Sequence, residues 1–422
     1  MTYRWVILVV GMLAYMTSYF ARSNTTGIAK LLSTDFNLDK AALGVLGASF
    51  LYAYALAQLP WGVASDRWGS RKAIGIGVFL TAVTLWGFAS GTSFNQLVFW
   101  RIINGIAAAS VYVVMAGALA RWFPAKERGL CQTAFAAVGG TAGEGTANLV
   151  LPYLALNIAS GWRQSTEIVA AGVGVAAIAC LVFLRSAPPG QPATERKPFD
   201  MAVLTDIRLW AFTFVYSGSI ISLRLFPVWL PIYAADIYIS RGMALKDAVL
   251  AAAGLSSLYL AGRLIGPPVM GWVSDRLVVR GISRLSLAVS FSLLAAVLFQ
   301  LMPLGIRSTT TLGAIAFLMG IAINMYPLVT TAMSETFGAQ RTSSVMGVLN
   351  TFAQLSGATA LFISGALGIA LNSSPGNTLE EYRGIWLVGL VGCLGTALVG
   401  VALYLIPAGA GLSRRGRTEF ES

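Results

Sequence analysis

Histidine is absent from this 422-residue chain. Its absence excludes imidazole-based metal sites, histidine-dependent catalytic triads and the HExxH metalloprotease pattern. The sequence also lacks the GxxxxGK[ST] phosphate loop and the GxSxG nucleophile turn. We therefore expect neither an enzyme nor an ATP-driven pump, and we expect no metal or cofactor.

Charged residues and cysteines are scarce as well. Charged residues make up 11% of the chain and hydrophobic residues 56%, whereas an ordinary soluble domain is roughly 25% charged. The three cysteines, Cys131, Cys180 and Cys393, lie in or beside apolar stretches, so no disulfide framework is expected. So few charges cannot cover a water-soluble protein of this length, which indicates a membrane protein.

Long apolar runs are what the sequence has in abundance. Each approaches the ~20 residues with which a helix crosses about 30 Å of hydrocarbon, and a helix satisfies its backbone groups within one segment. The alternating segments of about ten residues that a membrane barrel needs are missing. The pattern predicts an all-α membrane protein with twelve transmembrane helices near 5–28, 42–65, 72–91, 96–120, 130–156, 165–185, 208–235, 248–273, 283–303, 309–333, 343–370 and 384–407.

Basic residues are distributed unevenly between these spans. Most Lys and Arg residues fall in the two tails and in the connections after even-numbered spans. The positive-inside rule then places both termini in the cytoplasm. The same distribution accounts for the net charge of +12 without nucleic acid as a partner.

A proline-rich, charged stretch from Ser186 to Asp200 divides the chain into two halves. We expect a six-helix bundle over 1–185, a cytoplasmic linker over 186–207, and a second six-helix bundle over 208–422 with a short cytoplasmic tail. An internal repeat supports this division. The segment GVASDRWGSRK at 62–72 returns in weaker form as GWVSDRLVVR at 271–280.

The segment at 62–72 resembles the G-x-x-x-D-R-x-G-x-R-[KR] loop of the major facilitator superfamily. The resemblance implies two pseudo-symmetric six-helix bundles around a site near the bilayer midplane. It also implies that charges of the loop gate the transporter by forming and breaking contacts between states; fixing topology is the alternative role. A further superfamily-like segment starts with Arg101, for which we favour a structural bond. The candidate gating residues are Asp66, Arg67, Arg71, Asp275, Arg276 and Arg101.

The first span resembles narrower groups within this superfamily. Tyr19, Arg22 and Asn24 follow the Y-x-x-R-x-N pattern of the anion:cation symporters, which handle hexonates, hexuronates and related carboxylates. Arg22 with Arg224 is also similar to the arginine pair of spans 1 and 7 in the organophosphate:phosphate antiporters. The fourth span lacks the acidic residue common in the first group, and the fifth lacks the histidine of the second. Both resemblances imply an anion held between the two arginines.

Arginines inside the spans favour the same kind of ligand. An ionisable group at the bilayer centre costs about 2.5 to 3.5 kcal/mol, so it needs a partner or a wet cavity. Arg22, Arg101, Arg224 and Arg263 fall within spans, whereas the clear acidic counterpart is Glu144. An anionic ligand would balance the excess, because a guanidinium binds carboxylate or phosphate through two parallel bonds. The alternatives are snorkelling to the interface for Arg22 and a structural bond for Arg263.

Glu144 lies in the glycine-rich segment 139–148. Glycines let helices approach closely, and a low dielectric then favours the neutral carboxyl. A group that takes a proton in one state and releases it in another would couple transport to a proton gradient. A fixed salt bridge with an arginine is the alternative.

Aromatic and amide residues on the pathway-lining spans complete the predicted site. Tyr54 precedes Asp66 by the same twelve residues that separate Arg263 from Asp275, so the arginine pair of nitrate-type porters is only half present. Simple packing is the alternative for each member. The predicted substrate-binding residues are Arg22, Arg224, Arg263, Tyr15, Tyr19, Tyr54, Asn324, Tyr326, Asn350 and Gln354.

Together these features predict a secondary active transporter of a small organic anion, a carboxylate in our interpretation, which works by alternating access with proton coupling. An exchanger of phosphate esters or inorganic anions is the second prediction. Drug efflux is disfavoured, because the segment 139–145 lacks the proline that exporters carry there. We expect a monomer in a bacterial inner membrane, whose partners are the lipid bilayer, the anion and protons.

Overall fold

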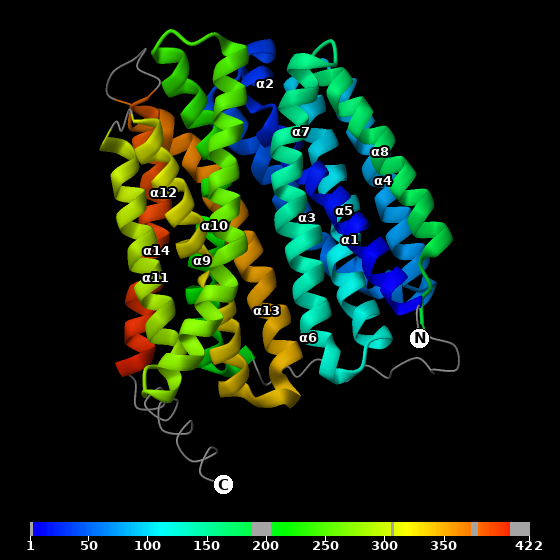
Figure 1. The fold of residues 1–422 in the computed structure, drawn as a ribbon, viewed down its shortest axis with the longest axis vertical. Helices are drawn as coiled ribbons and strands as arrows, with labels where there is room; N and C mark the ends of the chain where they lie inside the picture. Colours follow the sequence, from blue (N-terminus) through cyan, green and yellow to red (C-terminus); the bar gives the residue numbers. More distant parts are fainter. Residues whose placement is uncertain (1–2, 188–203, 305–307, 373–378, 406–422) are drawn as a thin grey trace. The chain divides into compact units, whose positions relative to one another are not determined.

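The computed structural model describes residues 3–187, 204–304, 308–372 and 379–405. Over these ranges the fold is all-helical and contains no strand (Figure 1). The predicted fold class is therefore confirmed. Most of the predicted linker (188–203) and the tail from residue 406 lie outside the described residues.

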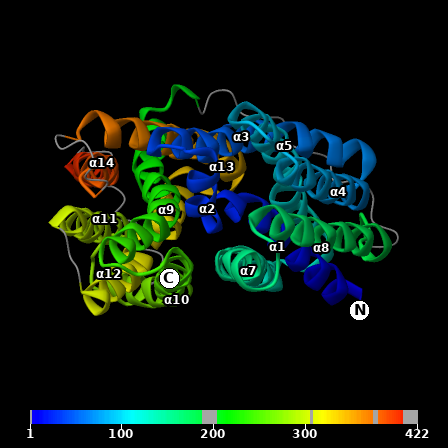
Figure 2. The same ribbon diagram turned by 90° about the horizontal axis from the view of Figure 1, so that it is seen from above.

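The first of two compact units comprises Met1–Glu195 and Leu230–Ser257. In it α1 packs against η1, α5, α7 and α8, while α4 packs on both α5 and α8 (Figure 2). Its helices are α1 (Tyr3–Gly27), α2 (Ala29–Phe36), α3 (Lys40–Trp68), α4 (Ser70–Ala89), α5 (Phe94–Trp122), α6 (Ala125–Ala134), η1 (Phe135–Ala142), α7 (Gly143–Asn157) and α8 (Trp162–Phe183), with the end of α9 (Ile207–Ser240) and the start of α10 (Leu245–Val279).

The second unit comprises Arg196–Trp229 and Leu258–Ser422. In it α11 packs along α14 and against α13, and α13 also packs on α14. Besides the remainder of α9 and α10 it contains α11 (Arg284–Leu301), η3 (Met302–Leu304), α12 (Thr309–Ala322), η4 (Ile323–Met325), α13 (Tyr326–Ala370) and α14 (Glu381–Leu405). Because the boundary between the units falls inside α9 and α10, the predicted division into halves at 186–207 stays a prediction.

Helix ends follow from local side-chain chemistry. The Asp39 carboxylate caps α3 by accepting a hydrogen bond from the Ala42 amide at 2.7 Å, and the Ser93 hydroxyl caps α5 in the same way. Gly69 separates α3 from α4 with a φ of 80°, a conformation that glycine adopts without steric cost. This turn lies inside the repeated loop motif, whose charged residues occupy the last turn of α3 and the first turn of α4.

The fifth predicted span differs from a regular transmembrane helix. Eleven stretches of the described residues are long and apolar enough to cross a membrane, and 130–156 is not among them. There the backbone changes from α6 to the π-helix η1 and then to α7. The wider π turns interrupt the continuous α-helix, and such interruptions are frequent at functional sites.

The tenth and eleventh predicted spans, 309–333 and 343–370, are both present. The connection between them is helical as well, so α13 is a 45-residue element. At 1.5 Å per residue such a helix is roughly 68 Å long, more than twice the ~30 Å hydrocarbon thickness. It therefore contributes to two spans, which run over Thr309–Phe337 and Val345–Ala370.

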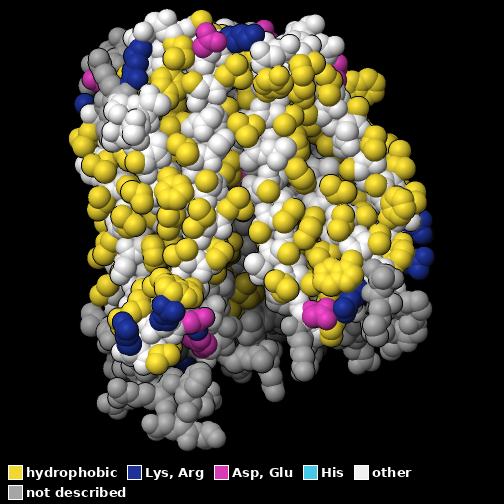
Figure 3. Space-filling model, in the orientation of Figure 1, with side chains coloured by type: hydrophobic (Ala, Val, Ile, Leu, Met, Phe, Trp, Pro, Cys, Tyr) yellow, Lys and Arg dark blue, Asp and Glu magenta, His cyan; other side chains and the backbone are white. Residues whose placement is uncertain are grey.

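The exterior is apolar along the helices. Figure 3 shows hydrophobic side chains over the middle of the visible helices, with Lys, Arg, Asp and Glu gathered towards the helix ends. Large apolar side chains such as Leu59, Trp86 and Leu398 are 76%, 65% and 71% exposed. Because lipid tails are as apolar as these side chains, the pattern fits a protein surrounded by a bilayer.

Candidate functional site

Arg22 lies in an aromatic cage inside the first unit. Its guanidinium carbon is 4.8 Å from the Tyr19 ring centre, 4.6 Å from that of Tyr54 and 6.0 Å from that of Phe50. The Nε and Nη1 atoms are buried, and neither has a hydrogen-bond partner among the described residues. A desolvated cation–π contact contributes about 2 kcal/mol, whereas burying an ion costs several kcal/mol. The cage therefore leaves two donor nitrogens, Nε and Nη1, for further acceptors.

Tyr15 extends the wall of this cage. It is 6% exposed, and its ring lies 5.2 Å from Tyr19, 5.4 Å from Tyr112 and 4.8 Å from Phe135. Phe135 begins the π-helix η1, so that helix helps to fix the tyrosines around Arg22. Sequence reasoning placed three of these tyrosines in the site, and the structure brings Tyr15, Tyr19 and Tyr54 together.

Glycines of η1 and α7 allow this close packing. A Cβ atom on Gly139 would lie 2.9 Å from the Tyr15 Cβ and 3.0 Å from the Met12 carbonyl oxygen. A Cβ on Gly140 would lie 3.1 Å from the Tyr15 ring. A side chain at either position would require α1 to shift, so the glycines allow the close contact of α1 and η1 that the glycine-rich segment predicted.

Glu144 follows directly after these glycines, in the first turn of α7. It is 7% exposed, and its charge interacts electrostatically with Arg22. The buried carboxyl thus lies within the electrostatic field of the caged arginine. Its role in proton coupling stays a prediction.

Arg101 holds backbone segments together beside the cage. It is 2% exposed. It donates hydrogen bonds from Nε to the Leu46 carbonyl at 3.2 Å, from Nη1 to the Ala21 carbonyl at 2.8 Å and from Nη2 to the Arg22 carbonyl at 3.4 Å. These bonds join α5 to α3 and to the part of α1 that carries Arg22. The contacts support a structural interpretation, and a gating role stays a prediction.

Arg224 is joined to two other predicted residues in the second unit. Its Nε and Nη2 donate to the Gln354 Oε1 at 3.2 and 2.9 Å, and Gln354 Nε2 donates to the Asn350 Oδ1 at 3.5 Å. A Cβ on Gly357 would lie 2.9 Å from the Arg224 Cγ, so α9 and α13 are close here. The neutral amide orients the guanidinium without neutralising its charge.

The remaining predicted residues of the second unit lie around α10, η4 and α13. Arg263 is 6% exposed, and its guanidinium carbon lies 5.8 Å from the Tyr259 ring. Asn324 Nδ2 donates to the Gly320 carbonyl at 2.6 Å and to the Arg263 carbonyl at 3.4 Å, which ties η4 to α10. Tyr326 forms an edge contact with Tyr216 at 6.5 Å. Both amide protons of Asn324 are thus donated to backbone carbonyls.

Charges of the first repeat of the loop motif lie at the junction of α3 and α4. Asp66 and Arg67 are exposed at the end of α3, and Arg71 is exposed at the start of α4. Arg71 Nε donates to the Leu181 carbonyl at 2.5 Å, which ties this junction to the end of α8. The gating roles of these three residues stay predictions.

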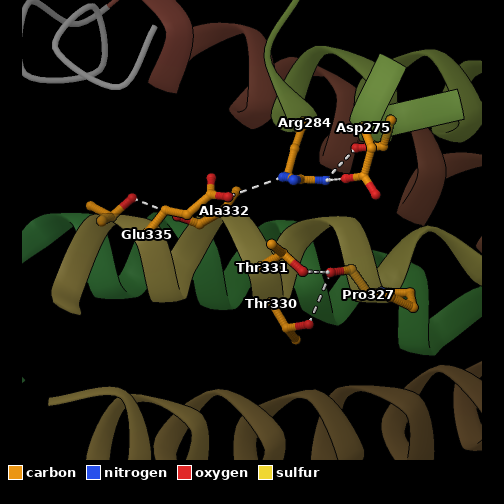
Figure 4. A network of polar contacts seen from close by, with 9 residues as sticks. Asp275, Arg284, Pro327, Thr330, Thr331, Ala332 and Glu335 are labelled. Carbon is orange, nitrogen blue, oxygen red and sulfur yellow. Dashed lines mark hydrogen bonds and ion pairs between the residues drawn. The ribbon is translucent and has the colours of Figure 1, made fainter. Parts of the chain in front are cut away.

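The second repeat forms an ion-pair network that Figure 4 shows. Arg284, at the start of α11, lies between Asp275 of α10 at 2.9 Å and Glu335 of α13 at 3.0 Å. It also donates to the Ser274 hydroxyl at 2.7 Å. The Arg276 guanidinium carbon lies 3.7 Å from the Trp272 ring centre, and the gating roles of Asp275 and Arg276 stay predictions.

Arg284 and Glu335 were missed in the sequence. Each stands alone at a span boundary, where a charge is ordinarily read as a marker of orientation. Only the packing of α10, α11 and α13 brings them together with Asp275. Their position on the same side of the membrane as the repeated motif is the feature of the sequence that could have indicated this network.

Arg22 and Arg224 lie in different compact units. Each has a polar or aromatic surround of its own, as described above. The predicted clamp, in which both arginines hold one anion, therefore stays a prediction. Among the described residues, no group of three or more Cys, Asp or Glu is arranged to hold a metal ion.

A helical membrane fold with two charged loop repeats and a caged arginine is typical of a membrane transporter. A sequence model of the Major Facilitator Superfamily matches residues 11–361, and the chain belongs to this family. The crystal structure of a D-xylose–proton symporter superposes with a TM-score of 0.69 at 18% identity, over 97% of this chain and 99% of that one. This second likeness concerns the fold.

Two relatives with transport names match the sequence. The probable sulfoacetate transporter SauU of Cupriavidus necator is 27% identical over 305 residues, which are 66% of this chain and 66% of that protein. The probable galactarate/D-glucarate transporter GudP of Bacillus subtilis is 23% identical over 88% of this chain and 87% of that protein. The chain is thus a multi-pass membrane protein and a secondary transporter, not an enzyme.

Proposed function

We propose that this transporter moves a small organic anion, with a carboxylate as the recognised group. The observation that carries the proposal is the Arg22 guanidinium, whose buried Nε and Nη1 have no hydrogen-bond partner among the described residues. A guanidinium binds a carboxylate through Nη2–H together with either Nε–H or Nη1–H, so each unpartnered donor of Arg22 lies on an edge that can receive an anion. A passing anion would supply the acceptors that the aromatic cage lacks.

Arg224 supports the same proposal from the second unit. Its bonds to Gln354 fix its orientation and leave its positive charge in place. In an alternating-access cycle the anion would contact Arg22 and Arg224 together. The names of the two relatives, which refer to sulfoacetate and to galactarate or D-glucarate, agree with an organic anion as cargo.

Proton coupling is the second element of the proposal. Glu144 is buried and acts electrostatically on Arg22. A neutral Glu144 leaves Arg22 available for the anion, whereas an ionised Glu144 competes with it. Proton and anion would then bind together, which gives symport into the cell along a proton gradient.

The test is counterflow in liposomes that contain the purified protein. The vesicles are loaded with sulfoacetate, D-glucarate, inorganic phosphate or nitrate, and uptake of the same labelled anion is followed. Exchange of at least one organic anion, lost in Arg22→Ala and in Arg224→Ala with normal protein amounts, supports the proposal. Exchange of phosphate or nitrate alone would establish the inorganic-anion alternative instead.

A variant of Glu144 separates binding from coupling. Glu144→Gln should retain counterflow of the anion, because exchange needs no net proton movement. It should lose uptake driven by an imposed proton gradient, measured together with an internal pH dye. Gradient-driven uptake that persists in Glu144→Gln would contradict the coupling role.

We also propose a cytoplasmic location for both termini and a bacterial inner membrane as the site of action. The uneven distribution of Lys and Arg between the connections supports this orientation. Proteolysis of sealed right-side-out vesicles tests it, because a terminal tag should be protected. Cleavage of the tag in intact vesicles would reverse the orientation.

A further inference from the structure

A buried carboxylate near the end of α9 lies between two lysines. Asp236 is 7% exposed, and its Oδ1 is 2.5 Å from the Lys30 ammonium while its Oδ2 is 3.8 Å from the Lys40 ammonium. Lys40 is 6% exposed, and the Lys30 side chain is 26% exposed. All three residues belong to the first unit. Neither the loop motif nor the Arg22 cage accounts for them.

Lys30 also lines a narrow pocket, which we call the Lys30 pocket. Its polar lining consists of Thr26, Lys30, Asn148 and Ser256, and its apolar lining includes Pro231. The interior has room for about one water-sized group, such as one oxygen of an oxyanion. Asn148 is 6% exposed, and its Oδ1 is buried without a hydrogen-bond partner among the described residues. The pocket therefore combines apolar walls with four polar residues, and it holds an amide oxygen that has no hydrogen-bond partner among the described residues.

The Lys30 pocket continues from the Arg22 cage along two packed helices. Thr26 follows Arg22 by four residues on α1, and Asn148 follows Glu144 by four residues on α7. Residues four apart lie on the same side of a helix, and α1 packs on α7. Polar groups thus succeed one another by about one helical turn, roughly 6 Å.

We propose that the Lys30 pocket is a second anion subsite, at which a carboxylate or sulfonate of the transported molecule takes the place of Asp236 on Lys30. The proposal rests on the proposed anion transport. Lys30 pairs with Asp236 through its ammonium and also lines the pocket, so a movement of its side chain would exchange one acceptor for the other. Lys40 stays beside Asp236 during the exchange, so the buried carboxylate keeps a cationic neighbour. Asn148, after rotation of its amide, donates to the incoming anion.

Opposite effects of the two partners distinguish this subsite from a structural ion pair. If Asp236 competes with the anion for Lys30, Asp236→Asn should tighten anion binding and Lys30→Gln should weaken it. A purely structural pair would be damaged in the same direction by either change. One charge-assisted hydrogen bond corresponds to a change of about tenfold or more in affinity.

The experiment follows the reaction of a cysteine in the pocket with N-ethylmaleimide, a neutral reagent. Thr26→Cys is introduced into the full-length purified protein, with Ser256→Cys as a second reporter if the first is poorly expressed. The natural cysteines are buried, and the chain without a reporter gives the background rate. Labelling rates are measured against increasing sulfoacetate, D-glucarate, phosphate or nitrate, with chloride to hold the ionic strength constant.

All reporters are also tested together with Arg22→Gln, so that binding at the cage does not account for protection. Saturable protection by at least one of the four anions, weakened in Lys30→Gln and strengthened in Asp236→Asn, supports the subsite. Asp35→Asn is the matched control, because its partner Arg163 forms a 2.6 Å pair outside the pocket; it should leave protection unchanged.

Three results would overturn the subsite: no protection by any of the anions with either reporter, protection that is unchanged in Lys30→Gln, or protection that is not strengthened in Asp236→Asn. These results are independent of counterflow. A chain that transports organic anions but shows none of this protection keeps the proposed function and loses the subsite. A chain that shows this protection but no counterflow of organic anions keeps the subsite and loses the proposed function.

Discussion

Replacing Arg22 by lysine is the change that most sharply tests the role of the aromatic cage. Lysine keeps the positive charge but presents a compact ammonium in place of a planar fork. In the structure, the Nε and Nη1 atoms of Arg22 have no acceptor among the described residues. A carboxylate bound across one edge of the guanidinium would lose one of its two charge-assisted bonds in Arg22→Lys and both of them in Arg22→Gln.

The expected magnitude follows from the strength of such bonds. A hydrogen bond to a charged group contributes ~1.5–3 kcal/mol, and 1.4 kcal/mol corresponds to a factor of ten. Arg22→Lys should therefore lower kcat/KM for uptake by ~10- to 150-fold. Arg22→Gln, which removes the charge and both donors, should lower it by at least about 100-fold.

The assay measures initial uptake rates over a range of anion concentrations, normalised to the protein in the membrane. Arg101→Lys is the matched control, because Arg101 is buried nearby but donates to backbone carbonyls. That control should lower thermal stability and leave KM close to that of the unchanged chain. Normal kcat/KM in both Arg22 variants would refute the proposed role of the cage.

Three further predictions concern packing and charge. Gly139→Val should reduce uptake and cost about 1–3 kcal/mol of stability, because its Cβ would lie 3.0 Å from a carbonyl oxygen of α1; unchanged melting and uptake would contradict this contact. Arg284→Gln removes its pairs with Asp275 and Glu335, partners that are 71% and 54% exposed. Pairs of this kind contribute only ~0.2–1 kcal/mol each, so Arg284→Gln should reduce the rate of uptake clearly while changing the melting temperature little. Complete unfolding of the variant would show that the network is structural. The hydrogen bond from Arg163 lowers the pKa of Asp35. This carboxylate therefore adds stability above its unfolded pKa of about 3.9, and the contribution is lost as the pH falls below that value. The melting temperatures of Asp35→Asn and the unchanged chain should converge below about pH 4, and equal melting temperatures at neutral pH would contradict this.

Most of the helical architecture could be predicted from apolar length alone. A helix that must cross hydrocarbon needs a long run without charges, so spans such as those over α4 and α5 were placed within a few residues. The π-helix over Phe135–Ala142 was not predictable in this way. Its hydrophobic pattern resembles that of an α-helix, and the close approach of Gly139 and Gly140 to α1 is visible only in the tertiary structure.

The candidate site shows the same division. Arg22 with its tyrosines could be predicted, because a charge and phenols inside an apolar span require an explanation. Asp236 could not, because it stands at the end of a predicted span where a carboxylate is ordinary. Its burial depends on Lys30 and Lys40, which are distant in sequence. The role of a charged residue at the end of a span can be inferred only when its partners in the tertiary structure are known.

The most direct test of the central claim is a thermal-shift screen of the purified protein against a library of organic and inorganic anions. A ligand that binds the folded protein raises its melting temperature by mass action. We predict that at least one organic anion raises it in a concentration-dependent manner, and that Arg22→Gln, at a similar melting temperature without ligand, loses this response. An equal shift in Arg22→Gln, or no shift with any organic anion, would contradict the claim that Arg22 binds the transported molecule.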